Sequence, residues 1–329
     1  MQVEVGLLLR MRKTEGYVLF DVNFSPDGKW VSYLLEDVLE RQATINVSRV
    51  DRSSNAEVGY CVQGSSVEPN GECYIYLWSP DSRSILWSDA RVVWLADIGQ
   101  PAKRLLDQGE DVGEKIYFPS AWSPSGQFIL SLIAFVDSDG GWYGIIDARS
   151  GDVDESLQAG VSIGAPGTDV IWLQDDRLFV ARPAYWEDDR PPTLEIWSVS
   201  PGGEKFLTQE RAVPIKTDSH KGWPADPIQL RDGRIAFFVF NNDNADYQTR
   251  GLYLTTSDLD APIKNNGVPP FMPDYFGAEI LWAPDGSGAL YHDWNTGRLL
   301  YIPTNENMLF DLRPFLGDHA GHFSWSPGN

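Results

Sequence analysis

The stretch AWSPSGQFILSLIAF, Ala121–Phe135, decides the fold because a tight turn in it runs directly into an apolar segment. The turn, WSPSG, resembles FSPDG at Phe24–Gly28, WSPDS at Trp78–Ser82 and WAPDG at Trp282–Gly286, and the chain ends on WSPGN. In such a turn proline presets φ, Asp or Ser bonds back to nearby amides, and glycine accepts a positive φ. We therefore expect the aromatic residue before the turn and the apolar run after it to lie on paired antiparallel strands.

The turn recurs along the whole chain. Its first position falls at Phe24, Trp78, Trp122, Trp172, Gln229, Trp282 and Trp325, at intervals of 54, 44, 50, 57, 53 and 43 residues. Two copies are degraded, WLQDDR from Trp172 and QLRDGR from Gln229, but an apolar segment follows each at the same offset. A unit of this size predicts a repeat architecture, for which propellers and solenoids are the main choices.

Each unit has the pattern of four strands. An apolar run follows the turn, a third strand such as WYGIIDA or LEIWSVS comes next, and a short fourth strand follows, for example EKFLT from Glu204. Because helical periodicity is almost absent, we predict an all-β fold, a β-propeller of four-stranded antiparallel blades, with six blades preferred and seven as the alternative. The expected blades span residues 20–65, 74–108, 117–160, 167–210, 224–266 and 276–316, within a single domain of residues 1–329.

These units resemble the TolB-type propeller repeat, a relative of the WD-repeat (WD40-like) propellers. The family pattern is an aromatic-Ser-Pro-Asp-Gly turn, an apolar strand, an Ile-Tyr-type strand ending near Asp, and a Leu-Thr-type outer strand. It fits Trp78–Leu106, Trp122–Leu157 and Trp282–Leu312 well, and the two middle units loosely. The resemblance covers roughly residues 20–327 and implies the fold, but this fold carries many unrelated sites.

The two ends of the chain leave the closure of the ring open. The segment HFSWSPGN near the C-terminus has the first strand of a seventh unit, and VEVGLLLRM near the N-terminus could supply an outer strand. Either six blades close, or a seventh is assembled from residues 317–329 and 1–12, or the chain belongs to a longer protein.

The composition is acidic. Lys plus Arg number 26 against 47 Asp plus Glu, which gives a net charge of −21. Such a chain repels a nucleic acid or an anionic membrane surface on average, so we expect no nucleic-acid partner. No segment is apolar and long enough to span a bilayer, so we expect no membrane insertion. The start has no convincing signal-peptide cleavage site; a cytoplasmic location follows if Met1 is native, and an extracytoplasmic one if a signal peptide was removed.

The two cysteines, Cys61 and Cys73, are separated by a turn-rich loop. A loop of that length could bring them together in a disulfide, which would indicate an oxidising compartment. Two buried thiols are the simpler interpretation. The spacing matches neither a CxxC redox motif nor a zinc site.

Strand alternation sorts the loops of each unit onto two faces. The repeated turns lie on one face, and the loops between second and third strands lie on the other, together with the connectors between blades. The second face is rich in aromatic and acidic residues, and the candidate ligand-binding residues are Trp142, Trp186, Trp223, Tyr275, Trp294, Asp139, Glu187, Asp188, Asp243 and Asp293. Packing between blades is the alternative role for any single one of these aromatics.

This mixture predicts recognition. Aromatic side chains supply contact area and polar groups supply orientation, so we expect non-catalytic binding of a protein or peptide partner through the second face. Its negative charge would suit a cationic or polyhydroxylated partner. The alternative is a carbohydrate-active or other hydrolytic propeller with a carboxylate site at the channel mouth, for instance Asp188 with Asp243.

Other chemistry has weaker support. The loops DSDGG at 137–141 and NNDNAD at 241–246 offer oxygen ligands for Ca²⁺, but neither has the EF-hand spacing, so we expect no cofactor and no metal. The histidines lack the HxxxH spacing of a zinc protease, and GHFSW lacks the nucleophile elbow of a hydrolase. His292 beside Asp293 could form an acid–base pair. Whether the protein is an enzyme stays open, with no enzyme activity the preferred expectation.

Overall fold

The described part of the chain consists of β-strands. The computed structural model describes residues 17–37, 42–62, 74–88, 92–107, 115–135, 140–162, 169–183, 191–201, 205–215, 223–240, 250–260, 262–264, 278–293, 297–305 and 308–312. Within these ranges no helix has the length and apolarity that crossing a membrane requires. The chain divides into two compact units, Met1–Gln158 and Ala159–Asn329.

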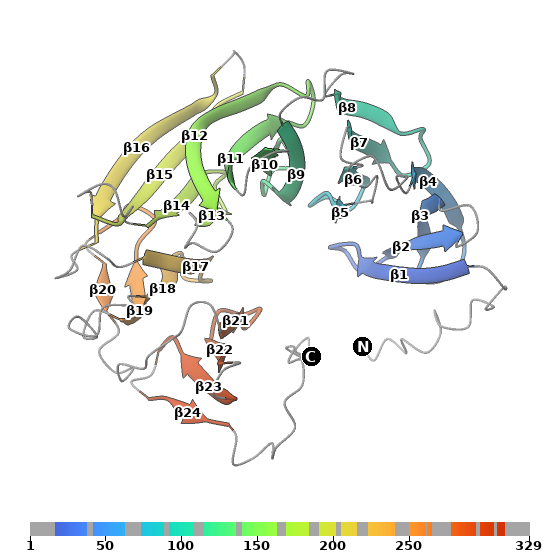
Figure 1. The fold of residues 1–329 in the computed structure, drawn as a ribbon. Coiled ribbons are helices and arrows are strands. Elements are labelled where there is room, and N and C mark those ends of the chain that lie inside the picture. The colour runs from blue at the N-terminus through green and yellow to red at the C-terminus, as the bar shows by residue number, and fades with distance from the viewer. Residues whose placement is uncertain are drawn as a thin grey trace. The chain divides into compact units, whose positions relative to one another are not determined.

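The first unit contains three four-stranded sheets, which we call blades 1, 2 and 3 (Figure 1). Blade 1 consists of β1 (Tyr17–Phe24), β2 (Trp30–Asp37), β3 (Gln42–Arg49) and β4 (Asn55–Val62). Blade 2 consists of β5 (Tyr74–Trp78), β6 (Ser84–Ser88), β7 (Val92–Asp97) and β8 (Lys103–Asp107). Blade 3 consists of β9 (Lys115–Trp122), β10 (Phe128–Phe135), β11 (Gly140–Asp147) and β12 (Val153–Ser162), the last of which crosses the boundary between the units.

The second unit contains blades 4, 5 and 6. Blade 4 consists of β13 (Asp169–Trp172), β14 (Leu178–Arg182), β15 (Thr193–Val199) and β16 (Leu207–Pro214). Blade 5 consists of β17 (Trp223–Gln229), β18 (Ile235–Phe240), β19 (Gly251–Thr255) and β20 (Ile263–Lys264). Blade 6 consists of β21 (Ala278–Trp282), β22 (Gly288–Asp293), β23 (Arg298–Pro303) and β24 (Phe310–Asp311).

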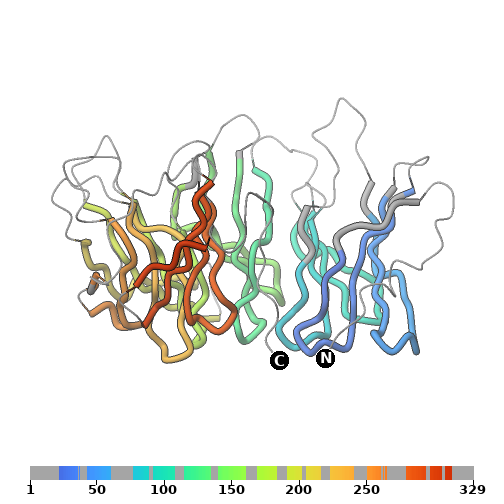
Figure 2. The backbone as a smooth tube through the Cα atoms, turned by 90° about the horizontal axis from the view of Figure 1, so that it is seen from below, coloured from blue at the N-terminus to red at the C-terminus, as the bar shows by residue number. Residues whose placement is uncertain are grey.

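In every sheet the strands pair in chain order and antiparallel, so each sheet is an up-and-down meander. Figure 2 shows the strands of each sheet running back and forth between the same two ends. This confirms the predicted all-β class with four-stranded antiparallel sheets. In blade 4 the fourth strand, expected at EKFLT from Glu204, is Leu207–Pro214, and it pairs with β15 along its whole length. The seventh turn copy, at Trp325, lies outside the described residues.

Apolar side chains hold neighbouring blades of one unit together. Between blades 4 and 5, Phe179 and Ala181 of β14 pack against Ile235, Phe237 and Val239 of β18, and all five are completely buried. Similar clusters join blades 1 and 2, blades 2 and 3, and blades 5 and 6. Full burial of one such side chain contributes about 1.5–3 kcal/mol. Second strands such as IAFFVF of β18 are apolar along their length, so their side chains can pack on both faces of the sheet.

The repeated turn has the same backbone in all six sheets. The amide of the fifth residue of the motif donates to the carbonyl of the second at 2.8–3.1 Å, from Gly28 to Ser25 in blade 1 through Gly286 to Ala283 in blade 6. The fifth residue always has a positive φ, and two of the six, Ser82 and Asp176, are not glycine, each with φ of 62°. The degraded copies are therefore true members of the repeat, and the predicted turn positions in the described residues are confirmed.

Candidate functional site

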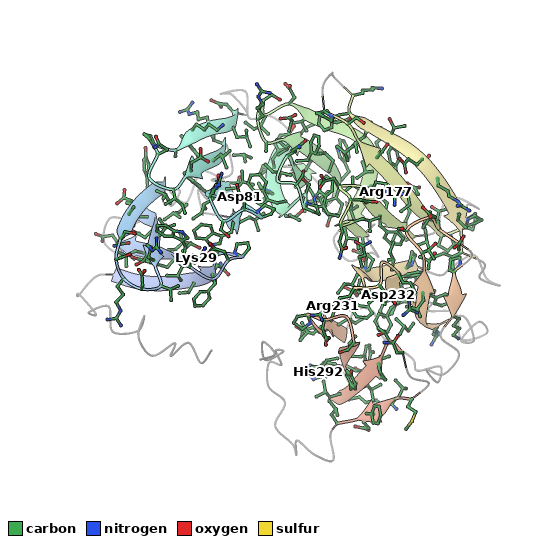
Figure 3. The ribbon with its side chains drawn as sticks, turned by 180° about the vertical axis from the view of Figure 1, so that it is seen from behind. Lys29, Asp81, Arg177, Arg231, Asp232 and His292 are labelled. Atoms are coloured by element: carbon green, nitrogen blue, oxygen red, sulfur yellow. The ribbon has the colours of Figure 1, made fainter. Side chains whose placement is uncertain are left out.

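Each blade has two different ends. The turns between first and second strands lie at one end, which we call the turn end, and the loops between second and third strands lie at the other, the loop end. Figure 3 labels residues of the turns, among them Lys29 and Asp81 in the first unit and Arg177 and Asp232 in the second. The loop-end segments lie outside the described residues, and with them seven candidate residues: Trp186, Tyr275, Trp294, Asp139, Glu187, Asp188 and Asp243.

At the turn ends the acidic side chains are satisfied within their own loops. Asp27 accepts from the Ser25 hydroxyl at 2.7 Å and from the Lys29 amide at 3.0 Å, and these bonds lower its pKa to about 2. Asp81 accepts in the same way from Ser79 and the Arg83 amide. These bonds agree with a structural role for the turn aspartates.

Neighbouring turns also bond to one another within a unit. The Asp27 amide donates to the Ser82 hydroxyl at 3.0 Å, and the Gln174 amide donates to the Gln229 side chain at 2.8 Å. The residues that depart from the motif, Ser82 for glycine and Gln229 for tryptophan, are the ones that make these contacts. The departures from the consensus thus connect neighbouring blades.

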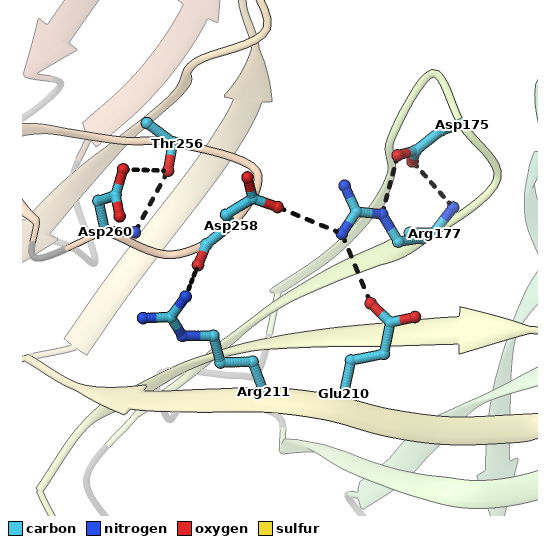
Figure 4. A network of polar contacts seen from close by, with 7 residues as sticks. All are labelled: Asp175, Arg177, Glu210, Arg211, Thr256, Asp258 and Asp260. Atoms are coloured by element: carbon cyan, nitrogen blue, oxygen red, sulfur yellow. Dashed lines mark hydrogen bonds and ion pairs between the residues drawn. The ribbon is translucent and has the colours of Figure 1, made fainter.

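A network of charged side chains also connects blades 4 and 5 at their turn ends (Figure 4). The Arg177 guanidinium contacts Asp175 at 2.8 Å, Glu210 at 3.5 Å and Asp258 at 3.9 Å. Arg211 donates to the backbone carbonyl of Asp258. Because these polar groups bind one another, the turn ends in the described residues resemble a structural surface more than a binding site.

Trp142, at the loop end of blade 3, holds a lysine of its own chain. The Lys115 ammonium lies 5.6 Å from the ring centre of Trp142 and reaches both carboxylate oxygens of Glu155, at 3.0 and 2.7 Å. The Tyr117 hydroxyl donates to the same carboxylate at 3.1 Å, and burial, followed by the charge of Glu155, raises the pKa of Tyr117. An aromatic ring and a carboxylate that share one ammonium combine a cation–π contact with an ion pair.

The other two described candidates are buried. Trp223 is 6% exposed and belongs to the core between blades 5 and 6. Asp293 is 6% exposed and ends β22 opposite Ala278 and Arg298. His292, which precedes it, is also buried, and strand alternation directs the two side chains to opposite faces of the sheet, so they do not form the acid–base pair that we considered.

Predictions about metals and the cysteines stay open. Cys73 and both oxygen-rich loops lie outside the described residues, and Cys61 lies near the end of β4. The described residues contain no cluster of three or more His, Cys, Asp or Glu that could hold a metal ion.

A buried ion pair supports the loop end of blade 4. Arg182, the last residue of β14, donates to both oxygens of Glu195 at 2.8 and 2.9 Å, and the Trp197 indole donates to the same carboxylate at 2.8 Å. The two charged side chains are 18% and 8% exposed. This pair fixes the strands on either side of the loop that carries Trp186, Glu187 and Asp188.

Sequence reasoning missed a carboxylate pair between blades 4 and 5. The Asp226 amide in β17 donates to the Asp169 carboxylate in β13 at 2.7 Å. Loss of hydration raises the pKa of Asp169 to about 6, and loss of hydration together with the charge of Asp169 raises that of Asp226 to about 7. A pair like this takes up a proton close to neutral pH.

A simple signal would have found the pair. Each aspartate stands three residues before the first position of its turn motif, Asp169 before Trp172 and Asp226 before Gln229. The same offset places Glu279 before Trp282. The predicted site residues were mainly loop residues, whereas Asp169 and Asp226 lie in the first strands of blades 4 and 5.

Similarity to solved structures identifies the architecture. No family model and no curated protein matches the sequence. A prolyl endopeptidase structure matches with a TM-score of 0.55 at 12% identity over 90% of this chain. Prolyl oligopeptidase B from Galerina marginata matches with a TM-score of 0.55 at 12% identity over 92%. An oligogalacturonate lyase from Vibrio parahaemolyticus matches with a TM-score of 0.53 at 13% identity, over 88% of this chain and 75% of that one. The chain has the β-propeller fold.

This similarity concerns the fold alone. The propeller chain spans 42% of each of the two peptidase chains that it matches. The matched propellers include enzymes of different chemistry, a peptidase and a lyase, as expected for a fold whose function depends on the site it carries.

Proposed function

We propose that this propeller is a non-catalytic recognition module that binds a protein or peptide through the loop ends of its blades. The observation that carries the proposal is the contrast between the ends. In the described turns the polar groups bind one another, as Asp27 with Ser25 and Arg177 with Asp175. The loop-end sequences carry tryptophans and carboxylates in segments longer than a tight turn, for example YWEDDRPP at 185–192.

The partner that suits this surface is cationic. The chain has a net charge of −21, and its loop-end sequences hold Glu187, Asp188 and Asp243 beside Trp186 and Trp294. At the loop end of blade 3 the chain already binds an ammonium group, that of Lys115, with Trp142 and Glu155. A lysine or arginine of a partner would meet the same two kinds of group. The proposal needs no cofactor, nucleic acid or membrane insertion, and we assign the repeats to the TolB-type propellers on the strength of their turn motif.

The test is direct binding to defined peptides. Immobilised synthetic peptides of equal length, one set rich in Lys and Arg, one rich in Asp and Glu and one neutral, are exposed to the full chain. We expect retention by the cationic set alone. The double variant Trp186→Ala, Trp294→Ala should weaken this binding by about tenfold or more, because a few aromatic residues dominate such interfaces.

The control is another aromatic residue. Tyr60 lies on β4, is 58% exposed and is far in sequence from every loop-end candidate. Tyr60→Ala should bind cationic peptides like the wild type. Equal binding by the double variant and the wild type, or a preference for acidic peptides, would refute the assignment.

A further inference from the structure

Asp169 and Asp226 face one another across the interface of blades 4 and 5. Asp169 pairs with Ala181 in the ladder of blade 4, and Ala181 packs toward blade 5. Residues directly opposite in a ladder project to the same face, so Asp169 also faces blade 5. In β17, the Asp226 amide donates to the Asp169 carboxylate, and this bond places Asp226 against blade 4.

Asp226 lies at an irregular position that links three blades. The ladder between β17 and β18 shifts register between Ala225 and Ile228, and Asp226 has a φ of 50°. Its amide donates to Asp169 of blade 4 at 2.7 Å, and its carbonyl accepts from the Trp282 indole of blade 6 at 2.8 Å. One bulge thus carries hydrogen bonds to the first strands of both neighbouring blades.

Among the described residues, no cation on the strands in contact faces the pair. On β14, Arg182 lies next to Ala181, so it projects away from blade 5, and it is paired with Glu195. β18 has no charged residue. On β21, Ile280 and Trp282 pack toward blade 5, which directs Glu279 to the opposite face.

The guanidinium groups of Arg177 and Arg234, at the turn ends of the two blades, are paired with nearby carboxylates. Arg177 contacts Asp175 and Glu210, and Arg234 contacts Asp232. The two aspartates therefore lie at an interface whose apolar cluster contains Phe179 and Phe237. The described strands in contact with them bring no cation that would compensate their charge.

We propose that the Asp169–Asp226 contact is a pH-sensitive joint between blades 4 and 5, which tightens when the pair takes up a proton. With both carboxyl groups ionised, like charges repel across the interface. With one proton bound, the repulsion disappears, and the Asp226 amide still donates to Asp169.

The direction of the effect follows from linkage. Both folded-state pKa values lie above the usual value of 3.8, at about 6 and about 7. The folded state therefore binds protons that the unfolded state releases, and this contact stabilises the fold increasingly as the pH falls from about 7 toward about 4. The Asp226 side chain is exposed to solvent, so water screens part of the repulsion and reduces the size of the effect.

The test is hydrogen exchange of the full chain followed by mass spectrometry between pH 5.5 and pH 8, corrected for intrinsic exchange. In the wild type, we expect peptides from β13 and β17 to open roughly 3–10-fold more at pH 8 than at pH 5.5. In Asp226→Asn and in Asp169→Asn this difference should become clearly smaller, because each variant removes one of the two titrating groups and the repulsion between them. Asparagine tolerates a positive φ at position 226, and at position 169 its carbonyl still accepts the Asp226 amide.

Asp176→Asn is the matched control. Asp176 lies in the same unit, also has a positive φ, and its substitution removes the same charge. This variant should keep the pH dependence of the wild type. The proposal fails if the wild type shows no pH dependence in β13 and β17, if both joint variants retain its full size, or if Asp176→Asn reduces it equally, since the last result would indicate relief of net charge alone.

Discussion

Aspartates in two regions of this protein have opposite environments. In the turn of blade 1, Asp27 receives a hydroxyl and an amide from its own loop, and its pKa falls to about 2. In the joint of blades 4 and 5, loss of hydration and then the charge of Asp169 raise the pKa of Asp226 to about 7. The same side chain is thus a fixed structural anion in one place and a proton acceptor in the other, because the donors around it differ.

The difference also separates a structural surface from a responsive one. Asp27, with a pKa of about 2, stays ionised around neutral pH, so it holds its loop without change. The joint carboxylates change charge close to neutral pH, and they do so between blades. Substitutions that add or remove hydrogen-bond donors or acceptors around these carboxylates test whether this contrast is real.

The largest effect on stability is expected at Glu195, whose buried carboxylate accepts hydrogen bonds at both oxygens. Glu195→Ala removes the acceptor of two bonds from Arg182 and one from Trp197. Removing one partner of a buried ion pair costs about 3–5 kcal/mol. Chemical denaturation at pH 7 measures the change in the free energy of unfolding.

The apolar replacement of both partners is the control for this prediction. The double variant Arg182→Met, Glu195→Leu should lose less stability than Glu195→Ala, since no charge then stays behind in the interface. If the single variant loses less than the double variant, burial and pairing do not determine the behaviour of these carboxylates, and the comparison fails.

The sequence predicted the turns better than the site. Its motif located the last residue of each first strand, from Phe24 in β1 to Trp282 in β21, because Pro, Asp and Gly act through local backbone geometry. Even the degraded copy at Trp172 forms the turn, since the backbone bond and a positive φ at Asp176 suffice. Local rules of this kind need no knowledge of neighbouring blades.

The candidate site depends on packing, which alternation alone does not determine. Alternation gives two faces to each strand, but it does not say which face meets a neighbouring blade, and so Trp223 was placed among ligand-binding residues although it lies in the core. Its contact with a ligand stays a prediction, as do those of the residues outside the described ranges. The Asp169–Asp226 pair was missed for the same reason, because it arises only when two sheets stack.

An intermediate effect is expected at Ser79, the second residue of the turn motif in blade 2. The buried Ser79 hydroxyl donates to Asp81 at 2.7 Å and accepts from the Ser84 amide at 2.9 Å. Ser79→Ala leaves these groups without that partner and should lower the free energy of unfolding by about 1–3 kcal/mol. Thermal and chemical unfolding measure the loss.

Blade 6 offers the reverse experiment. Alanine naturally occupies the corresponding position, Ala283, and Asp285 there accepts from the Ser287 amide. Ala283→Ser should stabilise the protein, by less than Ser79→Ala destabilises it, because the serine must fit a site that is already packed. If Ser79→Ala and Ala283→Ser both lower the free energy of unfolding by similar amounts, the hydroxyl acts through packing and not through its bond to the carboxylate.

The smallest effect, and the sharpest test of the contrast, is the loss of stability that Asp27 causes as the pH becomes acidic. Its folded-state pKa, about 2, lies below the usual 3.8, so its bonds stabilise the fold above about pH 4 and lose this contribution as the pH falls toward about 2. The wild type should therefore be more stable than Asp27→Asn at pH 6, and the two should converge near pH 2–3.

Asp226→Asn should differ from the wild type in the opposite sense, being more stable at pH 8 and converging with it near pH 4. Measuring unfolding midpoints of all three proteins across this range compares the two environments directly, since other carboxylates titrate equally in each. Difference curves of the same sign for Asp27 and Asp226 would mean that net charge, and not the local donors, determines how both aspartates titrate.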